Sequence, residues 1–186
     1  IGLDFDGGRL SIGALEAGSP NLMEGEFRYP GNLVPDLRFH KRGTQGILNI
    51  DERRRGSWMP VPFMASPKRW DLRFSRSLPL EVEVRADAGD IDLGLAGLNV
   101  RKLRMDTDAA NVTVDFPAGT GTTEASVKAD AASVNLSIPS GVAARIRLKA
   151  DVSSVNIDTS RFEKQGDYYV SPGYDAAKNR LELEVD

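Results

Sequence analysis

Aspartate recurs at a nearly fixed interval in the second half of this 186-residue chain. The recurring residues are separated by 21, 22 and 21 positions, and they are Asp87, Asp108, Asp130 and Asp151. If each repeat adds one turn of a stacked structure, the carboxylates form a column, and Ca²⁺ prefers such oxygen ligands. Calcium, however, needs roughly six to eight oxygens, and its roll motif has about nine residues and many glycines. We therefore expect these aspartates to fix a bend by accepting backbone hydrogen bonds.

The other residues with reactive side chains point to few reactions. The chain has no cysteine and one histidine, His40, which removes thiol chemistry and most zinc sites. Asp92, Asp115 and Asp158 are the carboxylates that a polysaccharide-cleaving β-helix would use. They follow from a repeating surface pattern, and no phosphate-binding loop, nucleophile elbow or zinc motif accompanies them. We therefore predict a protein that is not an enzyme and that needs no cofactor or metal.

Composition excludes several other classes of protein. Hydrophobic residues make up 40% of the chain and charged residues 27%, which is typical of a soluble globular protein. A net charge of −3 without a basic stripe argues against a nucleic-acid partner. No apolar run approaches the roughly 20 residues that span a bilayer. Because the chain starts with Ile1, we expect that a leader or anchor segment is missing from it.

Each recurring aspartate lies in a phrase that predicts a bend between two strands. Val82 and Val84 alternate with charged residues before the first bend, and Ile91 and Leu93 continue the alternation after it. Alternation with a period of two predicts strands that are buried on one face. Hairpins alone would not repeat this phase every 21 or 22 residues, whereas stacked rungs about 4.8 Å apart would.

The repeat therefore predicts an all-β protein. We expect a single right-handed parallel β-solenoid, or β-helix, of stacked rungs of about 21–22 residues, with a looser N-terminal β part. Asn135 and Asn156 occupy equivalent positions and predict an amide ladder between rungs. The outward positions mix charge signs and predict a solvated face; one such column is Arg85, Asp106, Lys128 and Lys149.

Two parts are distinguished along the chain. Residues 1–75 form an N-terminal β segment in which Leu3–Ile12 repeats the strand–bend–strand phrase, and residues 76–186 carry the regular repeats. Prolines interrupt the first part and exclude a helix or a central strand there; they are Pro60, Pro62 and Pro67. We expect the stretch that contains these prolines to be a long connection. We also expect residues 1–75 and 76–186 to form one continuous structural unit.

Two aromatic clusters depart from the repeat and are the predicted interaction surface. The first lies in the proline-rich connection and the second in an insertion before the last strand; their members are Trp58, Phe63 and Met64, and Tyr168, Tyr169 and Tyr174. Exposed aromatic and methionine side chains attract partners. The alternative is structural: Trp58, Phe63 and Trp70 would fill the core, and the tyrosines would cover one flank with their hydroxyl groups in water.

The last strand predicts an unfinished rung. Leu181, Leu183 and Val185 repeat the first half of the phrase, and no second half follows Asp186. An uncovered rung presents unpaired backbone groups. We expect a trimmed chain, and the alternative is self-association through the open end of the solenoid.

The phrases around Val82–Leu93 and Ser153–Ile157 resemble the bacterial toast-rack family, as do Leu3–Ile12 and the Trp70–Arg73 lead-in. That family is similar to LiaF-like cell-wall-active antibiotics response C-terminal domains and to adhesin-like domains of stacked strands. This chain departs from it by placing Ala-Ala or Val-Ser where Gly-Ala-Gly is usual, and by lacking the last half rung. The first departure implies bends that depend less on glycine.

The resemblance implies a non-catalytic bacterial cell-envelope or extracytoplasmic domain of poorly defined role, anchored by a segment outside this chain. Our leading hypothesis is a β-solenoid scaffold for protein interaction or for modulating envelope stress, with an envelope or membrane protein as partner. The alternative hypothesis is a carbohydrate-binding or carbohydrate-active β-helix. An aromatic groove beside an acidic pair would favour the alternative.

Overall fold

A computed structural model describes residues 1–29, 33–54, 68–119, 121–130, 132–149 and 155–186. The all-β prediction is confirmed, because these residues form strands and a single short 3-10 turn, η1 (Tyr174–Ala176). The strands are β1 (Gly2–Phe5), β2 (Arg9–Ala14), β3 (Met23–Arg28), β4 (Leu33–Arg42), β5 (Gln45–Arg54), β6 (Arg69–Phe74), β7 (Pro79–Gly94), β8 (Asn99–Asp115), β9 (Thr122–Ala129), β10 (Ser133–Ser137), β11 (Ala143–Leu148), β12 (Val155–Ile157), β13 (Glu163–Gln165), β14 (Tyr168–Val170) and β15 (Arg180–Val185).

Each central rung is one chain segment folded over at its bend. In β7 the buried alternation runs through Val82 and Val84, breaks at the exposed Asp87, and resumes at Ile91 and Leu93. β8 repeats this and pairs with β7 in parallel along both halves, as in Val84↔Met105 and Ile91↔Val112. The 21-residue offset predicted from the sequence is therefore the register between these two rungs.

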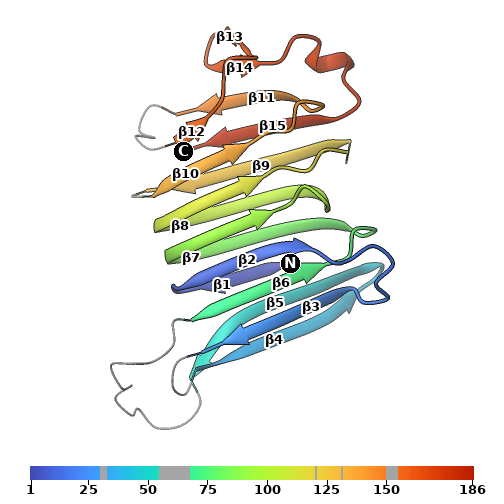
Figure 1. The fold of residues 1–186 in the computed structure, drawn as a ribbon, viewed down its shortest axis with the longest axis vertical. Helices are drawn as coiled ribbons and strands as arrows, with labels where there is room; N and C mark the ends of the chain where they lie inside the picture. Colours follow the sequence, from blue (N-terminus) through green and yellow to red (C-terminus); the bar gives the residue numbers. More distant parts are fainter. Residues whose placement is uncertain (30–32, 55–67, 120, 131, 150–154) are drawn as a thin grey trace.

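Folding at the bends produces two strand layers with the core between them (Figure 1). The first layer has the order β13-β14-β11-β15-β9-β8-β7-β1-β5-β4, and the second layer has the order β12-β10-β8-β7-β2-β6-β3. Neighbours are parallel in the middle, whereas antiparallel pairs lie at both ends of the first layer and at the β3 end of the second. The sheet is therefore mixed, and the order of its described strands is open at both ends.

The first fifteen residues form a rung, as predicted. β1 pairs with the first half of β7, as in Leu3↔Val84, and β2 pairs with the second half, as in Leu10↔Ile91. On the other side, β5 pairs with β1 and β6 pairs with β2, so β5 and β6 form the two halves of one further rung. The proline-rich connection joins these halves. Its predicted interaction residues Trp58, Phe63 and Met64 lie outside the described residues.

Trp70 fills the core at this end of the rack. Its side chain is fully buried, and its ring meets Phe5 edge-on at 5.1 Å and Phe27 at 5.5 Å between centroids. Beside it lies a buried ion pair, in which Lys68 Nζ meets Glu52 Oε1 and also lies 4.4 Å from the centre of the Phe5 ring. The structural role predicted for Trp70 is confirmed.

The prediction that the last strand forms an open end of the array is wrong. β15 lies inside the first layer, where it pairs in parallel with β9 on one side and with β11 on the other. The predicted column had Lys128 next to Lys149, which would place two like charges side by side. β15 instead inserts Asp186 at this level, where it accepts a hydrogen bond from Lys149 Nζ at 2.8 Å, and its backbone bonds to both Val127 and Ala129. Asp186 is therefore not an open solenoid end.

One finer prediction about the rungs is confirmed. Asn156 Nδ2 donates to Asn135 Oδ1 at 3.3 Å, which is the expected amide ladder. Glycine use differs from bend to bend: Gly8 and Gly89 take positive φ values of 113° and 122°, whereas Ala110, which pairs with Gly89, has no positive φ.

Candidate interaction surfaces

The tyrosine-rich insertion caps one end of the first layer. β14 pairs antiparallel with β11, and β13 pairs antiparallel with β14, so this hairpin ends the run of parallel strands (Figure 1). Tyr169 lies opposite Ile146, half-buried against the core. Tyr174 and Tyr168 lie near the outward side chains of β11 and β15 instead. The insertion therefore separates its three tyrosines into different environments.

Tyr174 is a structural residue. Its side chain is 7% exposed, the Arg145 guanidinium lies 4.5 Å from the ring centre, and its hydroxyl donates to Glu182 Oε2 at 3.0 Å. The structural alternative placed this hydroxyl group in water. It instead donates its hydrogen bond to Glu182. Burial, followed by the hydrogen bond to Glu182 and the negative charge there, raises the pKa of Tyr174 to about 12.

The pKa of Tyr174 predicts a loss of stability in alkaline solution. Because the pKa of this phenol is higher in the folded state than in the unfolded state, its contribution is complete below about pH 10 and is lost as the pH rises towards 12. The free-energy difference between the wild-type protein and Tyr174→Phe should therefore be constant up to pH 10 and shrink above it. Urea titrations from pH 7 to 11.5 measure this. Tyr168→Phe is the control, and an equal alkaline trend in both variants would contradict the assignment.

Tyr168 lines a shallow depression on the outer face of the first layer. Its ring lies 5.8 Å from the Arg147 guanidinium. The depression has a volume of about 370 Å³, and its charged lining is Lys102, Arg104, Glu124, Arg147, Glu182 and Glu184. The short side chain of Ser126 lies among these long ones. Tyr168 is thus the predicted site residue that the structure places on a hollowed surface.

The charges around this depression are mostly paired across rungs. Arg147 lies 3.8 Å from Glu184, and Lys102 lies 3.8 Å from Glu124. All four side chains are at least one-third exposed, so each pair contributes well under 1 kcal/mol to stability. The face therefore presents alternating charges around one aromatic ring.

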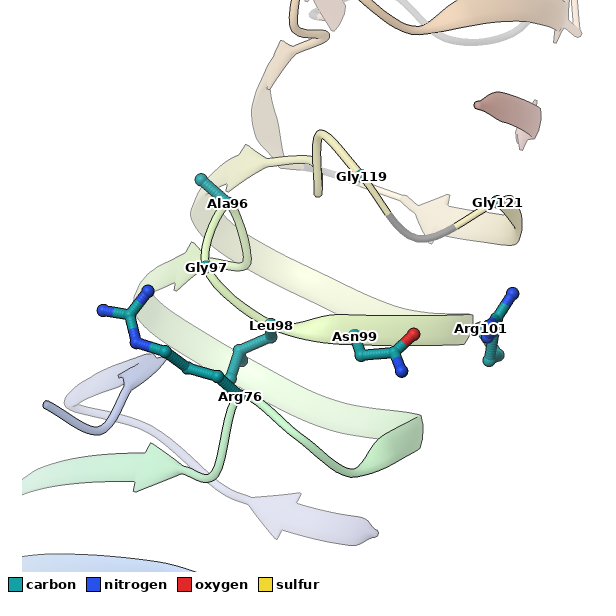
Figure 2. Close-up of a pocket in the computed structure, with 8 residues that line it drawn as sticks. All are labelled: Arg76, Ala96, Gly97, Leu98, Asn99, Arg101, Gly119 and Gly121. Atoms are coloured by element: carbon teal, nitrogen blue, oxygen red, sulfur yellow. The ribbon is translucent and has the colours of Figure 1, made fainter. Parts of the chain in front are cut away.

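A second depression lies on the flank opposite the bends. Its volume is about 490 Å³, and three successive turns between rungs line it with Arg76, Ala96, Gly97, Leu98, Asn99, Arg101, Gly119 and Gly121. Figure 2 shows Arg76 and Arg101 towards opposite ends, with Asn99 between them. No acidic residue is among the lining residues. We did not predict this site, because its arginines belong to different turns and share no motif.

The predicted chemical residues do not converge. Asp87, Asp108 and Asp130 are exposed at successive bends, and a hydrogen bond of the expected two-residue kind occurs at Asp158, whose Oδ1 accepts from Ser160 N at 2.9 Å. Asp151 lies outside the described residues. No cluster of three metal-ligating side chains occurs in the described ranges. Within the same ranges no helix is long and apolar enough to cross a membrane.

Comparisons with known proteins identify the fold. Residues 1–145 match a family model described as the N-terminal domain of toast_rack, DUF2154. No curated protein matches the chain. A solved structure from Clostridium sporogenes, described as a candidate cell adhesion protein, is similar with a TM-score of 0.82 over 99% of this chain and 85% of that chain. The two sequences are 21% identical, so the likeness is one of fold.

Proposed function

The chain belongs to the family of the toast_rack N-terminal domain, DUF2154, and from this membership we propose that it is a non-catalytic domain of the cell envelope that presents a rigid surface to a protein partner. The proposal includes an extracytoplasmic location, a LiaF-like relationship and a role in modulating envelope stress. It also includes a right-handed winding of the rungs, and two sequence parts, 1–75 and 76–186, within one solenoid-like unit. The candidate cell adhesion protein with a similar fold supports the extracytoplasmic location.

The observation that carries the proposal is the depression around Tyr168. A two-layer rack with backbone hydrogen bonds from rung to rung is stiff, so its outer face keeps a fixed shape. On that face, Tyr168 and Arg147 provide the aromatic and guanidinium groups that are enriched at protein–protein hot spots. The paired charges around them set the orientation of a partner more than its affinity.

Site-specific cross-linking in the native cells tests this proposal. A photo-reactive amino acid in place of Tyr168 should capture one specific envelope protein, and Arg147→Glu in the same chain should reduce the capture by about tenfold. The matched control places the same group at Arg85, on the outer face of β7 and away from the depression. Equal capture from both positions would contradict a partner surface centred on Tyr168.

One observation favours a carbohydrate ligand as the second candidate. Tyr168 lines the same depression as Glu182 and Glu184, and an aromatic ring next to a pair of carboxylates suits a sugar. A glycan array that gives hits with the wild-type domain, and loses them with Tyr168→Ala, would establish this function. An array without hits, together with specific cross-linking from position 168, would leave the protein-binding function.

A further inference from the structure

We propose that the depression between Arg76 and Arg101 is a binding site for an extended oxyanion, a ligand that carries phosphate or carboxylate groups at two positions. The site lies on the flank opposite the aspartate bends and shares no lining residue with the depression around Tyr168. It is therefore independent of the proposed protein-binding surface.

A β-bulge directs Arg101 into this site. Leu80 pairs with Val100, but the next residue, Glu81, pairs with Lys102, so Arg101 is an extra residue in β8. Bulges are rare between parallel strands, and they reorient a side chain next to functional sites. Val100 and Leu103 both remain buried, and Arg101 is left exposed on the turn side.

The surrounding structure supports the bulge. The hydroxyl of Thr123, which is 2% exposed, donates to the Val100 carbonyl at 2.9 Å. A buried carbonyl without a partner would cost about 1–3 kcal/mol, so this hydroxyl stabilises the irregular backbone. A side chain from the next rung thus donates a hydrogen bond to the backbone carbonyl at the bulge, so the bulge is an integral part of the fold.

Both guanidinium groups are available for a ligand. Arg76 Nε donates to the Leu15 carbonyl at 2.8 Å, which fixes the side chain and leaves its Nη donors. Neither Arg76 nor Arg101 forms an ion pair with any other residue that the structure describes, in contrast to Lys102 and Arg147 on the outer face. An arginine fork binds carboxylate or phosphate oxygens in pairs.

Glycines allow both arginines to lie close to the backbone turns. A Cβ atom on Gly97 would lie 2.5 Å from Arg76 Nη1, and one on Gly121 would lie 3.0 Å from Arg101 Nη1. Between the two, the Oδ1 atom of Asn99 is buried and has no hydrogen-bond partner among the described residues. Asn99 also lines the depression, and its Nδ2 group is a hydrogen-bond donor.

Titration with two small probes tests the site. Sodium triphosphate and citrate, each added at constant ionic strength to ¹⁵N-labelled domain, distinguish phosphate from carboxylate ligands. We expect one or both to shift the backbone amides of Gly97, Gly119 and Gly121. Arg101→Ala or Arg76→Ala should weaken binding by about tenfold or more, and Arg101→Lys should restore only part of the affinity because the fork is lost.

Arg104→Ala is the matched control, because Arg104 lies on the same strand but lines the depression around Tyr168. It should leave the affinity unchanged. Arg101→Ala and Arg104→Ala should keep the wild-type melting temperature because both side chains are exposed, whereas Arg76→Ala also loses the hydrogen bond to the Leu15 carbonyl. An affinity loss in Arg104→Ala equal to that in Arg101→Ala would show non-specific attraction to surface cations and overturn the proposal. Absence of any shift with either probe would also overturn it.

Discussion

Gly89→Ala should destabilise the protein by about 3 kcal/mol or more. Gly89 lies at the first bend with a φ of 122°, a conformation that side-chain-bearing residues rarely adopt. A Cβ atom there would lie 2.3 Å from the carbonyl oxygen and 2.8 Å from the nitrogen of Gly8, both of which are backbone atoms of the neighbouring rung. Neither strand can move away without breaking the hydrogen bond that Asp90 N donates to the Gly8 carbonyl at 2.8 Å. Equilibrium urea unfolding measures the loss.

Gly13→Ala is the control for this prediction. Gly13 lies in β2 with ordinary strand geometry, and a Cβ atom there meets nothing within 4 Å. Alanine should therefore be neutral or slightly stabilising, because it reduces the entropy of the unfolded chain. Equal losses of stability in Gly89→Ala and Gly13→Ala would show that the approach of the new Cβ atom to the Gly8 backbone does not cause the destabilisation at Gly89.

Glu52→Gln should destabilise the protein by about 3 kcal/mol, because it leaves the Lys68 ammonium buried without a counter-charge. The side chains of Lys68 and Glu52 are only 9% and 7% exposed, and the ammonium lies against the Phe5 ring. Water therefore cannot replace the lost carboxylate. Chemical unfolding measures the change, which is among the largest expected from a single polar substitution here.

A double variant that replaces both members of the ion pair tests whether the lost stability comes from the unpaired Lys68 charge. Glu52→Leu combined with Lys68→Met should recover most of the lost stability, since a buried ion pair and an apolar pair of similar volume are often nearly equivalent. Glu83→Gln is the exposed control: Glu83 pairs with Arg85 at 2.6 Å, but both side chains are more than 40% exposed, so its loss should stay below about 1 kcal/mol. A double variant less stable than Glu52→Gln would contradict this account.

The sequence predicted the rung itself because the physical causes of a rung are local. Alternation around Val84 and Ile91 identifies two strands, and the repeated bend sets their phase, so the register between β7 and β8 follows. The pairing of Asn135 with Asn156 follows for the same reason. Both the register and the amide pair follow once each repeat stacks directly on the next one.

The place of β15 could not be predicted in this way. Leu181 and Leu183 would bury equally well beside any first-layer strand, so alternation alone does not decide between neighbours. The insertion that precedes β15 ends the sheet as a hairpin and returns the chain to the gap between β9 and β11. The environment of Tyr174 depends on this placement, since Glu182 belongs to β15. Its hydroxyl partner therefore could not be predicted either.

The sequence signal for the second depression was present but ambiguous. Val100 and Leu103 are separated by two polar residues, which breaks the alternation, and we interpreted the outward residues only as a solvated face. A bulge and an ordinary surface irregularity give the same local pattern. Only the pairing of Glu81 with Lys102, two positions after Val100 on β8, distinguishes them.

The interior position of β15 also determines the order of events in folding. The described strands β9 and β11 do not pair with each other, and β15, which joins them, is made only after residues 130–179 have followed β9 and residues 149–179 have followed β11. Until it inserts, the backbone edges of β9 and β11 that pair with β15 lack these hydrogen-bond partners. Assembly during synthesis should therefore stall at a partly open intermediate, which would be the form most exposed to proteolysis and aggregation. Insertion of β15 would then be the step that closes the first layer.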